Sequence, residues 1–201
     1  MRTFTFFLVL IIAGVPFPSF GQQPMEAVQQ AIEKGIHVLD DPRFQELDGK
    51  KVQQEKLRQI MLEAFDFKEF SRRVLGPYWK NFSPQQREEF VRVFGNFLCK
   101  FYLGRLQERY NNERVIYLGQ QMISDSSALV EIEVLWRNLK IPVTLRMTNR
   151  SGKWKAYDLN FFGINAVSNY RAQFKWILSK ESPQQIIGRL KEKITEMDEK
   201  S

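Results

Sequence analysis

The sequence predicts an α+β fold in which several helices pack against a small antiparallel sheet of about four strands. Three observations support this. Apolar residues recur with helical spacing up to about Tyr110, alternate with a period of two over 113–160, and regain helical spacing over 165–197. Helices followed by strands and then by helices are typical of an antiparallel sheet with one covered face.

The early helices are predicted from periodicity and from residues that begin or end a helix. Met25–Leu39 and Val52–Phe65 both carry apolar residues three and four positions apart. An Asp-Pro pair ends the first, because the residue before proline is driven out of the α region. A shorter helix, Phe67–Leu75, follows Asp66, which is a good N-cap, and ends at a Gly-Pro pair.

The longest predicted helix covers Pro84–Tyr110. Ser83 is a favourable N-cap, and proline at the first helical position loses no hydrogen bond. The helix carries two adjacent apolar stripes that are rich in aromatic rings, opposite a narrow polar edge. The stripes consist of Phe90, Phe94, Phe97, Phe101 and of Val91, Leu98, Tyr102, Leu106.

The strands follow in short succession, which predicts an antiparallel meander. Each alternates apolar and polar residues, as a half-buried strand does. The predicted strands are Val115–Ile123, Val130–Trp136, Ile141–Thr148 and Lys153–Leu159, and the predicted closing helices are Asn165–Leu178 and Pro183–Met197.

Residues 1–21 have the pattern of an export signal that is removed. One basic residue precedes the apolar run Phe4–Val15, and Ser19 and Gly21 fit the −3 and −1 positions of a cleavage site before Gln22. A membrane anchor is the alternative, but the run is shorter than the roughly 20 residues that span a bilayer. We therefore expect an exported protein.

Removal of this segment leaves one expected domain over 22–201, with a helical part at 22–110, a sheet at 113–160 and C-terminal helices at 165–197. The whole chain has 201 residues, 17 phenylalanines and a formal net charge of +7. The expected mature chain keeps twelve phenylalanines and a charge of +6. Export argues against nucleic acid as a partner and favours anionic lipid or membrane surfaces for a basic protein.

Few residues carry an obvious catalytic pattern. Cys99 lies in the long helix beside its ring-lined face and is best interpreted as a buried, inert thiol, and His37 as a surface or packing residue. With one Cys and one His, the sequence predicts neither an internal disulfide nor a Cys/His zinc site. Glu131 and Glu133 share a strand face, which leaves a carboxylate pair imaginable.

The aromatic residues allow two interpretations. Rings of the long helix, of the end of the sheet and of the next helix are predicted to enclose one space. They form either an ordinary core or the wall of a cavity that holds an apolar ligand. The residues concerned are Phe82, Phe90, Phe94, Phe97, Phe101, Tyr102, Phe161, Phe162, Tyr170 and Phe174.

Three segments resemble a known family. They are Val74–Trp79 (VLGPYW), the SPQQREEF helix start with its aromatic continuation to Tyr102, and Trp154–Phe174, with WKAYD, Gly163 and NYRAQF. Together they are similar to the periplasmic phospholipid-binding shuttle of the Mla (maintenance of lipid asymmetry) system, the toluene-tolerance protein family. The similarity spans most of Val52–Leu190.

The resemblance implies a non-enzymatic carrier with a small antiparallel sheet and a deep apolar cavity for acyl chains, with phospholipid as cargo and no cofactor or metal. It implies two partners: an inner-membrane ABC transporter complex with its substrate-binding component, and an outer-membrane lipoprotein complex. On this interpretation fifteen residues line or border the cavity. They are Val74, Leu75, Tyr78, Trp79, Phe94, Leu98, Phe101, Tyr102, Val143, Leu145, Trp154, Tyr157, Phe162, Tyr170 and Phe174.

A phosphate head group would stay at the mouth, since its burial demands paired charge. The candidates for a basic rim are Arg72, Arg73, Lys80, Arg171 and Lys175, each of which also fits an ordinary solvated surface. Two other function classes stay open. One is a periplasmic hydrolase acting on lipid-like substrates, and the other is an interaction module that holds no ligand.

Overall fold

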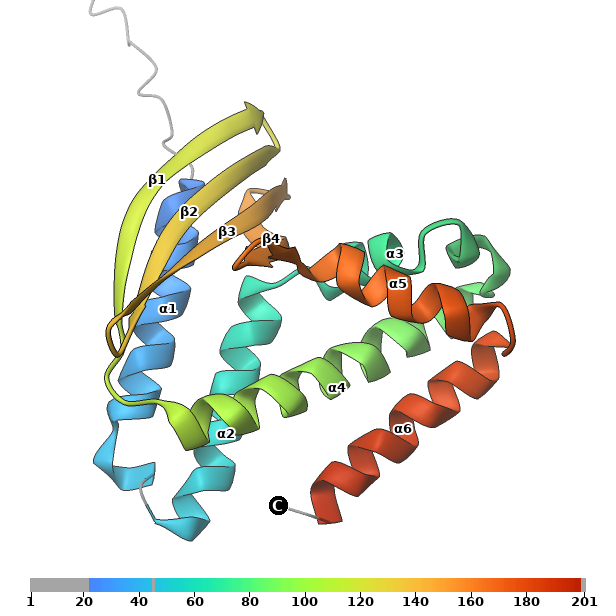
Figure 1. Cartoon of the computed structure of the whole chain (residues 1–201), viewed down its shortest axis with the longest axis horizontal. Helices are drawn as coiled ribbons and strands as arrows, with labels where there is room; N and C mark the ends of the chain where they lie inside the picture. The colour runs from blue at the N-terminus through green and yellow to red at the C-terminus, as the bar shows by residue number, and fades with distance from the viewer. Residues whose placement is uncertain (1–21, 45, 200–201) are drawn as a thin grey trace, which may run out of the picture.

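The computed structural model describes residues 22–44 and 46–199, so the predicted signal segment lies outside the described residues. The predicted α+β class is confirmed (Figure 1). The helices are α1 (Pro24–Asp40), α2 (Leu47–Ala64), α3 (Phe67–Leu75), α4 (Pro84–Arg109), α5 (Ala166–Leu178) and α6 (Pro183–Glu199), with short 3₁₀ helices η1 (Pro42–Phe44) and η2 (Gly76–Asn81). The strands are β1 (Arg114–Ser124), β2 (Ser127–Trp136), β3 (Leu139–Arg150), β4 (Lys153–Phe161) and β5 (Ile164–Asn165).

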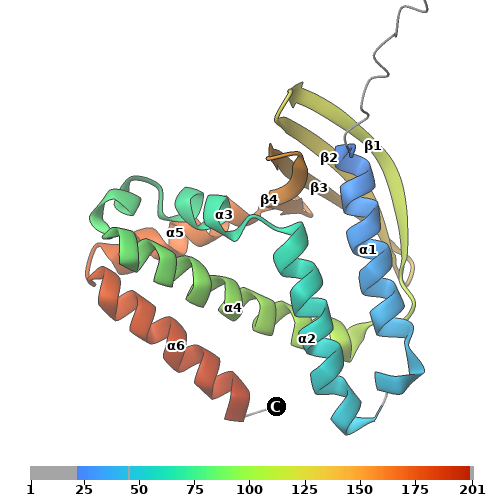
Figure 2. The same cartoon turned by 180° about the vertical axis from the view of Figure 1, so that it is seen from behind.

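The sheet is an antiparallel meander in the order β1-β2-β3-β4-β5. Its four long strands were predicted, and β5 adds two residues at the edge. Val130 lies opposite Leu145 and Ile132 opposite Val143, so these side chains share one face of the sheet. The sheet curves, and α1 lies along its concave side in both views (Figures 1 and 2).

Buried residues form two separate cores. The first lies on the concave face of the sheet, where Val28 of α1 packs with residues of β2, β3 and β4 such as Val130 and Trp154. The second lies among α2 to α6 and contains most of the buried rings, including Phe94 and Phe174. Phe65, directly after α2, packs against both cores.

Helix starts follow the predicted capping residues. Ser83 accepts a hydrogen bond from the Gln86 amide in a capping box, and Asp66 accepts one from the Glu69 amide. Helix α2 begins at residue 47, five residues earlier than predicted. The apolar periodicity does not reveal this first turn, because the segment 47–51 carries charges and a glycine. No helix within 22–44 or 46–199 combines the length and apolar character needed to cross a membrane.

Candidate functional site

An apolar cavity of about 780 Å³ lies between the concave face of the sheet and helices α1, α2 and the C-terminal end of α4. That volume is in the range of small-molecule binding pockets. Nearly all lining residues are aliphatic or aromatic. The two charged ones are Arg109, the last residue of α4, and Glu113, which follows the helix. The cavity therefore has an apolar body and one polar end.

Helix α1 forms one wall with unusually small residues. Ala27, Ala31 and Gly35 follow one another at intervals of four, so they share one helix face, and all three line the cavity. A Cβ atom built at Gly35 would meet no atom within 4 Å. The stripe leaves volume that larger side chains would fill.

The sheet forms the opposite wall through its alternating inward residues. Val143, Leu145 and Trp154 line the cavity from β3 and β4. The register of β4 shifts at Tyr157, where Ala156 pairs with Met147 and Asp158 with Arg146. This bulge changes the alternation, and Phe161 reaches the same cavity although strict alternation from Trp154 would place it on the other face.

The turn after β4 brings a second ring to the cavity. Phe162 and Gly163 both have positive φ, +52° and +78°, as in the two-residue turns that favour Asn-Gly. A phenylalanine in the left-handed region carries strain, which costs of order 1–3 kcal/mol. Phe161 and Phe162 are 43% and 53% exposed while lining the cavity, so they lie at its mouth.

The structure brings four of the fifteen predicted residues to this cavity: Val143, Leu145, Trp154 and Phe162. The other eleven lie elsewhere. Those in or against the helical core are Val74, Leu75, Trp79, Phe94, Leu98, Tyr170 and Phe174. Of the rest, Tyr157 is buried, Tyr78 and Phe101 are half-buried, and Tyr102 is 46% exposed.

The rings of α4 pack against one another and against α3 and α5. The centroid of the Phe94 ring lies within 5.8 Å of the ring centroids of Phe70, Phe90, Tyr170 and Phe174. Phe90 and Phe94 are completely buried, so this part of the aromatic set is core. The set divides because one stripe of α4 faces helices, while only its end, including Leu103 and Leu106, reaches the cavity.

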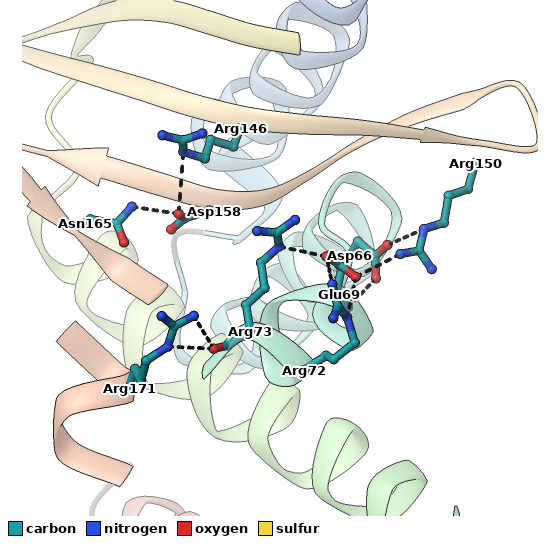
Figure 3. A network of polar contacts seen from close by, with 9 residues as sticks. All are labelled: Asp66, Glu69, Arg72, Arg73, Arg146, Arg150, Asp158, Asn165 and Arg171. Carbon is teal, nitrogen blue, oxygen red and sulfur yellow. Dashed lines mark hydrogen bonds and ion pairs between the residues drawn. The ribbon is translucent and has the colours of Figure 1, made fainter. Parts of the chain in front are cut away.

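The five predicted rim residues do not line the cavity either. Lys80 and Lys175 are exposed. Arg171 donates two hydrogen bonds to the carbonyl oxygen of Arg73, at 2.9 and 2.7 Å, and so joins α5 to the end of α3 (Figure 3). Arg72 and Arg73 both bind the carboxylate of Glu69.

Glu69 is the centre of a polar network between α3 and the β3–β4 hairpin (Figure 3). Its buried carboxylate lies 2.6 Å from Arg72, 2.7 Å from Arg73 and 2.9 Å from Arg150. Burial favours a higher pKa for Glu69, but the hydrogen bonds from the arginines outweigh it, and the pKa is lowered. The network fixes the sheet to the helical part of the molecule.

A second carboxylate organises the turn after β4. Asp158 is 4% exposed and accepts hydrogen bonds from the amides of Leu159 and Val167 and from the Asn165 side chain. Arg146 lies 3.9 Å from it on the neighbouring strand. These contacts determine where α5 begins relative to β4 and the mouth of the cavity.

The residues considered as candidates for catalysis do not line the cavity. Cys99 is fully buried, and burial raises the pKa of its thiol to about 11, which makes it a poor nucleophile. His37 is exposed in the last turn of α1. Glu131 and Glu133 project from the face opposite the inward Val130 and Ile132, and Glu133 pairs with Lys140 at 3.4 Å. The described residues include no cluster of three or more metal ligands.

Comparison with known proteins assigns the chain to a family. The sequence pattern of the family described as MlaC protein matches residues 29–192. The chain belongs to the MlaC family. The match includes all of β1 to β5, most of α1 and most of α6.

One relative resembles the chain in sequence, and one solved structure resembles it in fold. The intermembrane phospholipid transport system binding protein MlaC of Haemophilus influenzae is 26% identical over 125 residues, which cover 60% of this chain and 58% of that protein. A phospholipid-binding protein from Ralstonia solanacearum, solved in complex with a phospholipid, superposes with a TM-score of 0.75 at 22% identity. That superposition covers 88% of this chain and 99% of the other.

Sequence reasoning missed the α1 side of the MlaC cavity. The lining includes Val28, Ile32, Ile36 and Leu39 of α1 besides its small residues. The signal was present as the Ala27, Ala31, Gly35 stripe on a helix that is otherwise apolar on that face. Small residues four positions apart on a helix have two possible meanings. They let the helix approach its neighbour closely, or they leave a cavity between the two, and the structure shows the second.

Proposed function

We propose that this protein is a phospholipid carrier that holds acyl chains in the 780 Å³ cavity. The observation that carries the proposal is a cavity of ligand size with an almost wholly apolar lining, in a chain of the MlaC family. The phospholipid in the Ralstonia solanacearum protein, whose fold is similar, and the transport role in the name of the Haemophilus influenzae relative support it.

The physical basis is the transfer of hydrocarbon out of water. Each methylene buried in an apolar site contributes about 0.8 kcal/mol, so a lipid with two chains crosses an aqueous compartment only inside such a site. Binding and release then follow from relative affinity for donor, carrier and acceptor, with no covalent step. A periplasmic location after removal of residues 1–21 agrees with this role.

The proposal extends to partners. A carrier between two membranes needs a donor and an acceptor. We assign these roles to an inner-membrane ABC transporter complex with its substrate-binding component and to an outer-membrane lipoprotein complex. Val143, Leu145, Trp154 and Phe162 are the predicted contacts that line the cavity, and we propose that they touch the acyl chains.

The test places a large side chain in the cavity by substituting Gly35 of α1. Gly35→Phe places a ring where a Cβ meets no atom within 4 Å, and the cavity receives it. Gly188→Phe is the matched control, because Gly188 of α6 also has open space around its Cβ and does not line the cavity. Gly35→Ala adds helix propensity with little loss of volume.

The readout is native mass spectrometry of each purified protein after incubation with phospholipid vesicles. Wild type, Gly35→Ala and Gly188→Phe should carry phospholipid, and Gly35→Phe should carry at least about 10-fold less, with a Tm close to that of Gly188→Phe. A wild-type protein without bound phospholipid, or equal loading of both phenylalanine variants, would contradict the proposal.

A further inference from the structure

A second, polar pocket opens beside the apolar cavity. Its volume is about 460 Å³, and Arg109, Tyr110, Glu113 and Trp136 line both spaces. Glu108, Asn111 and Arg137 complete its lining. The two spaces are therefore contiguous, and the polar pocket lies where the apolar lining ends.

Two arginines in this pocket have no acidic partner. In the described part of the chain, neither Arg109 nor Arg137 makes an ion pair or a hydrogen bond through its guanidinium. The Arg137 guanidinium lies 5.2 Å from the centre of the Trp136 ring, so the ring holds it at the boundary between the two spaces. By contrast, Arg72, Arg73 and Arg150 are bound to Glu69.

The backbone at Arg137 is also unusual. Its φ of +54° lies in the left-handed region, which glycine adopts without strain and arginine does not. The residue begins the tight turn between β2 and β3, where a glycine would be less strained. Ser151 and Phe162 hold the same position in the turns after β3 and β4 and also have positive φ, so the strain belongs to the turn type. What is particular to Arg137 is a charged side chain in the pocket lining.

The same pocket contains acidic groups. Glu108 is exposed and has no ion-pair partner among the described residues, and Glu113 accepts a hydrogen bond from the Asn111 amide at 2.8 Å. The Tyr110 hydroxyl donates a hydrogen bond to Asp40 at 2.9 Å, which fixes the position of the Tyr110 side chain in the pocket lining. Two guanidinium groups and two carboxylates in one pocket match a ligand that carries both charges.

We propose that this pocket binds the head group of a zwitterionic phospholipid, with the phosphate at Arg109 and Arg137 and the ammonium group at Glu108 and Glu113. The proposal rests on the carrier function, since the acyl chains occupy the adjoining apolar cavity. Arginine suits the phosphate because its planar donors match two phosphate oxygens at once. The carboxylates give the pocket a reason to prefer an ammonium head group to a neutral or anionic one.

The experiment offers the protein vesicles of equimolar phosphatidylethanolamine and phosphatidylglycerol and measures the bound lipids by native mass spectrometry. Wild type should be enriched in phosphatidylethanolamine by about 3-fold or more. The double variant Arg109→Gln/Arg137→Gln should retain about 5- to 10-fold less total phospholipid. Glu108→Gln/Glu113→Gln should lose the preference for phosphatidylethanolamine, because the remaining arginines accept either phosphate.

Lys34→Gln/Lys56→Gln is the matched control, since it removes two exposed charges from α1 and α2 without touching either pocket. It should bind like wild type. Glycerophosphoethanolamine, which carries the head group without chains, should compete only at high concentration, which separates a lipid head-group site from a site for free phosphodiesters.

The outcomes separate the two proposals. Wild type without any lipid contradicts the carrier function. Wild type with lipid, but with arginine variants that bind like the lysine control, overturns the head-group assignment alone. The assignment is also overturned when Lys80→Gln/Lys175→Gln lowers retention and Arg109→Gln/Arg137→Gln does not.

Discussion

The guanidinium of Arg150, at the end of β3, lies 2.9 Å from the buried carboxylate of Glu69 in α3 (Figure 3). Arg150 also lies 3.4 Å from Asp66, the N-cap of α3. These contacts join the sheet to the helical part at a point far from the mouth of the cavity. Glu69 thus binds arginines from both sides of the junction.

Glu69→Gln should lower the free energy of unfolding by about 1–3 kcal/mol, because three arginines lose a buried charged acceptor. The estimate stays below that for a fully buried pair, since the arginine side chains are about half exposed. Urea unfolding measures it. Glu55→Gln is the control, because Glu55 pairs with Arg58 on an exposed helix face and should cost less than about 1 kcal/mol. Equal losses in both variants would contradict a special role for Glu69.

The stability contributed by Glu69 should depend on pH. Its folded-state pKa is lowered below the ordinary value of 4.5. The contribution is therefore complete above the unfolded-state pKa and is lost as pH falls through the folded-state pKa. The difference in unfolding free energy between wild type and Glu69→Gln should be constant near neutral pH and shrink below about pH 4.5. A difference that grew on acidification would have the wrong sign.

The Cys99 thiol should react slowly in the folded protein. Its pKa is raised from 9.0 to about 11 by burial, which reduces the thiolate fraction near pH 8 about 100-fold before steric access is considered. Alkylation by iodoacetamide, followed by mass spectrometry, should be at least that much slower in buffer than in guanidinium chloride. Rapid labelling of the native protein would show that the interior around α4 opens readily.

Replacing Phe162 should distinguish the effect of its strained backbone on stability from the effect of its ring on lipid binding. Phe162→Asn relieves the left-handed backbone, which is worth about 1 kcal/mol, and loses the part of the ring that is buried. We expect the free energy of unfolding to stay within about 1 kcal/mol of wild type while phospholipid retention falls several-fold. Ser151→Asn is the control, because Ser151 and Gly152 form a similar turn with positive φ that does not line the cavity. Unchanged retention in Phe162→Asn would remove this ring from the lipid site.

Local features of the fold were predictable from the sequence because they depend on neighbouring residues. Ser83 and Asp66 begin helices as their chemistry dictates, and the change of period at about residue 113 marks the sheet. The sequence predicts the start of α2 five residues late, because the segment 47–51 carries no apolar pattern. These are effects of propensity and capping within a few positions of the chain.

The site was harder to predict because periodicity identifies buried residues but not their neighbours. Phe94 and Leu103 lie on the same helix and belong to the same helical core, yet only Leu103 also lines the cavity. The bulge at Tyr157 redirects Phe161, and alternation cannot foresee an extra residue. Arg109 and Arg137 come together only through the fold, 28 positions apart in the chain.

The position of Phe65 has a consequence for motion. This residue packs against both cores, and its strand-like contact with Ala156 is reinforced by a 2.7 Å hydrogen bond from the Asp66 amide to the Ala156 carbonyl. Phe65 also lines the cavity, which lies between the sheet on one side and α1, α2 and the C-terminal end of α4 on the other. Rotation about such a point widens or narrows the cavity while each core keeps its own packing, so Phe65 is the place to expect a hinge.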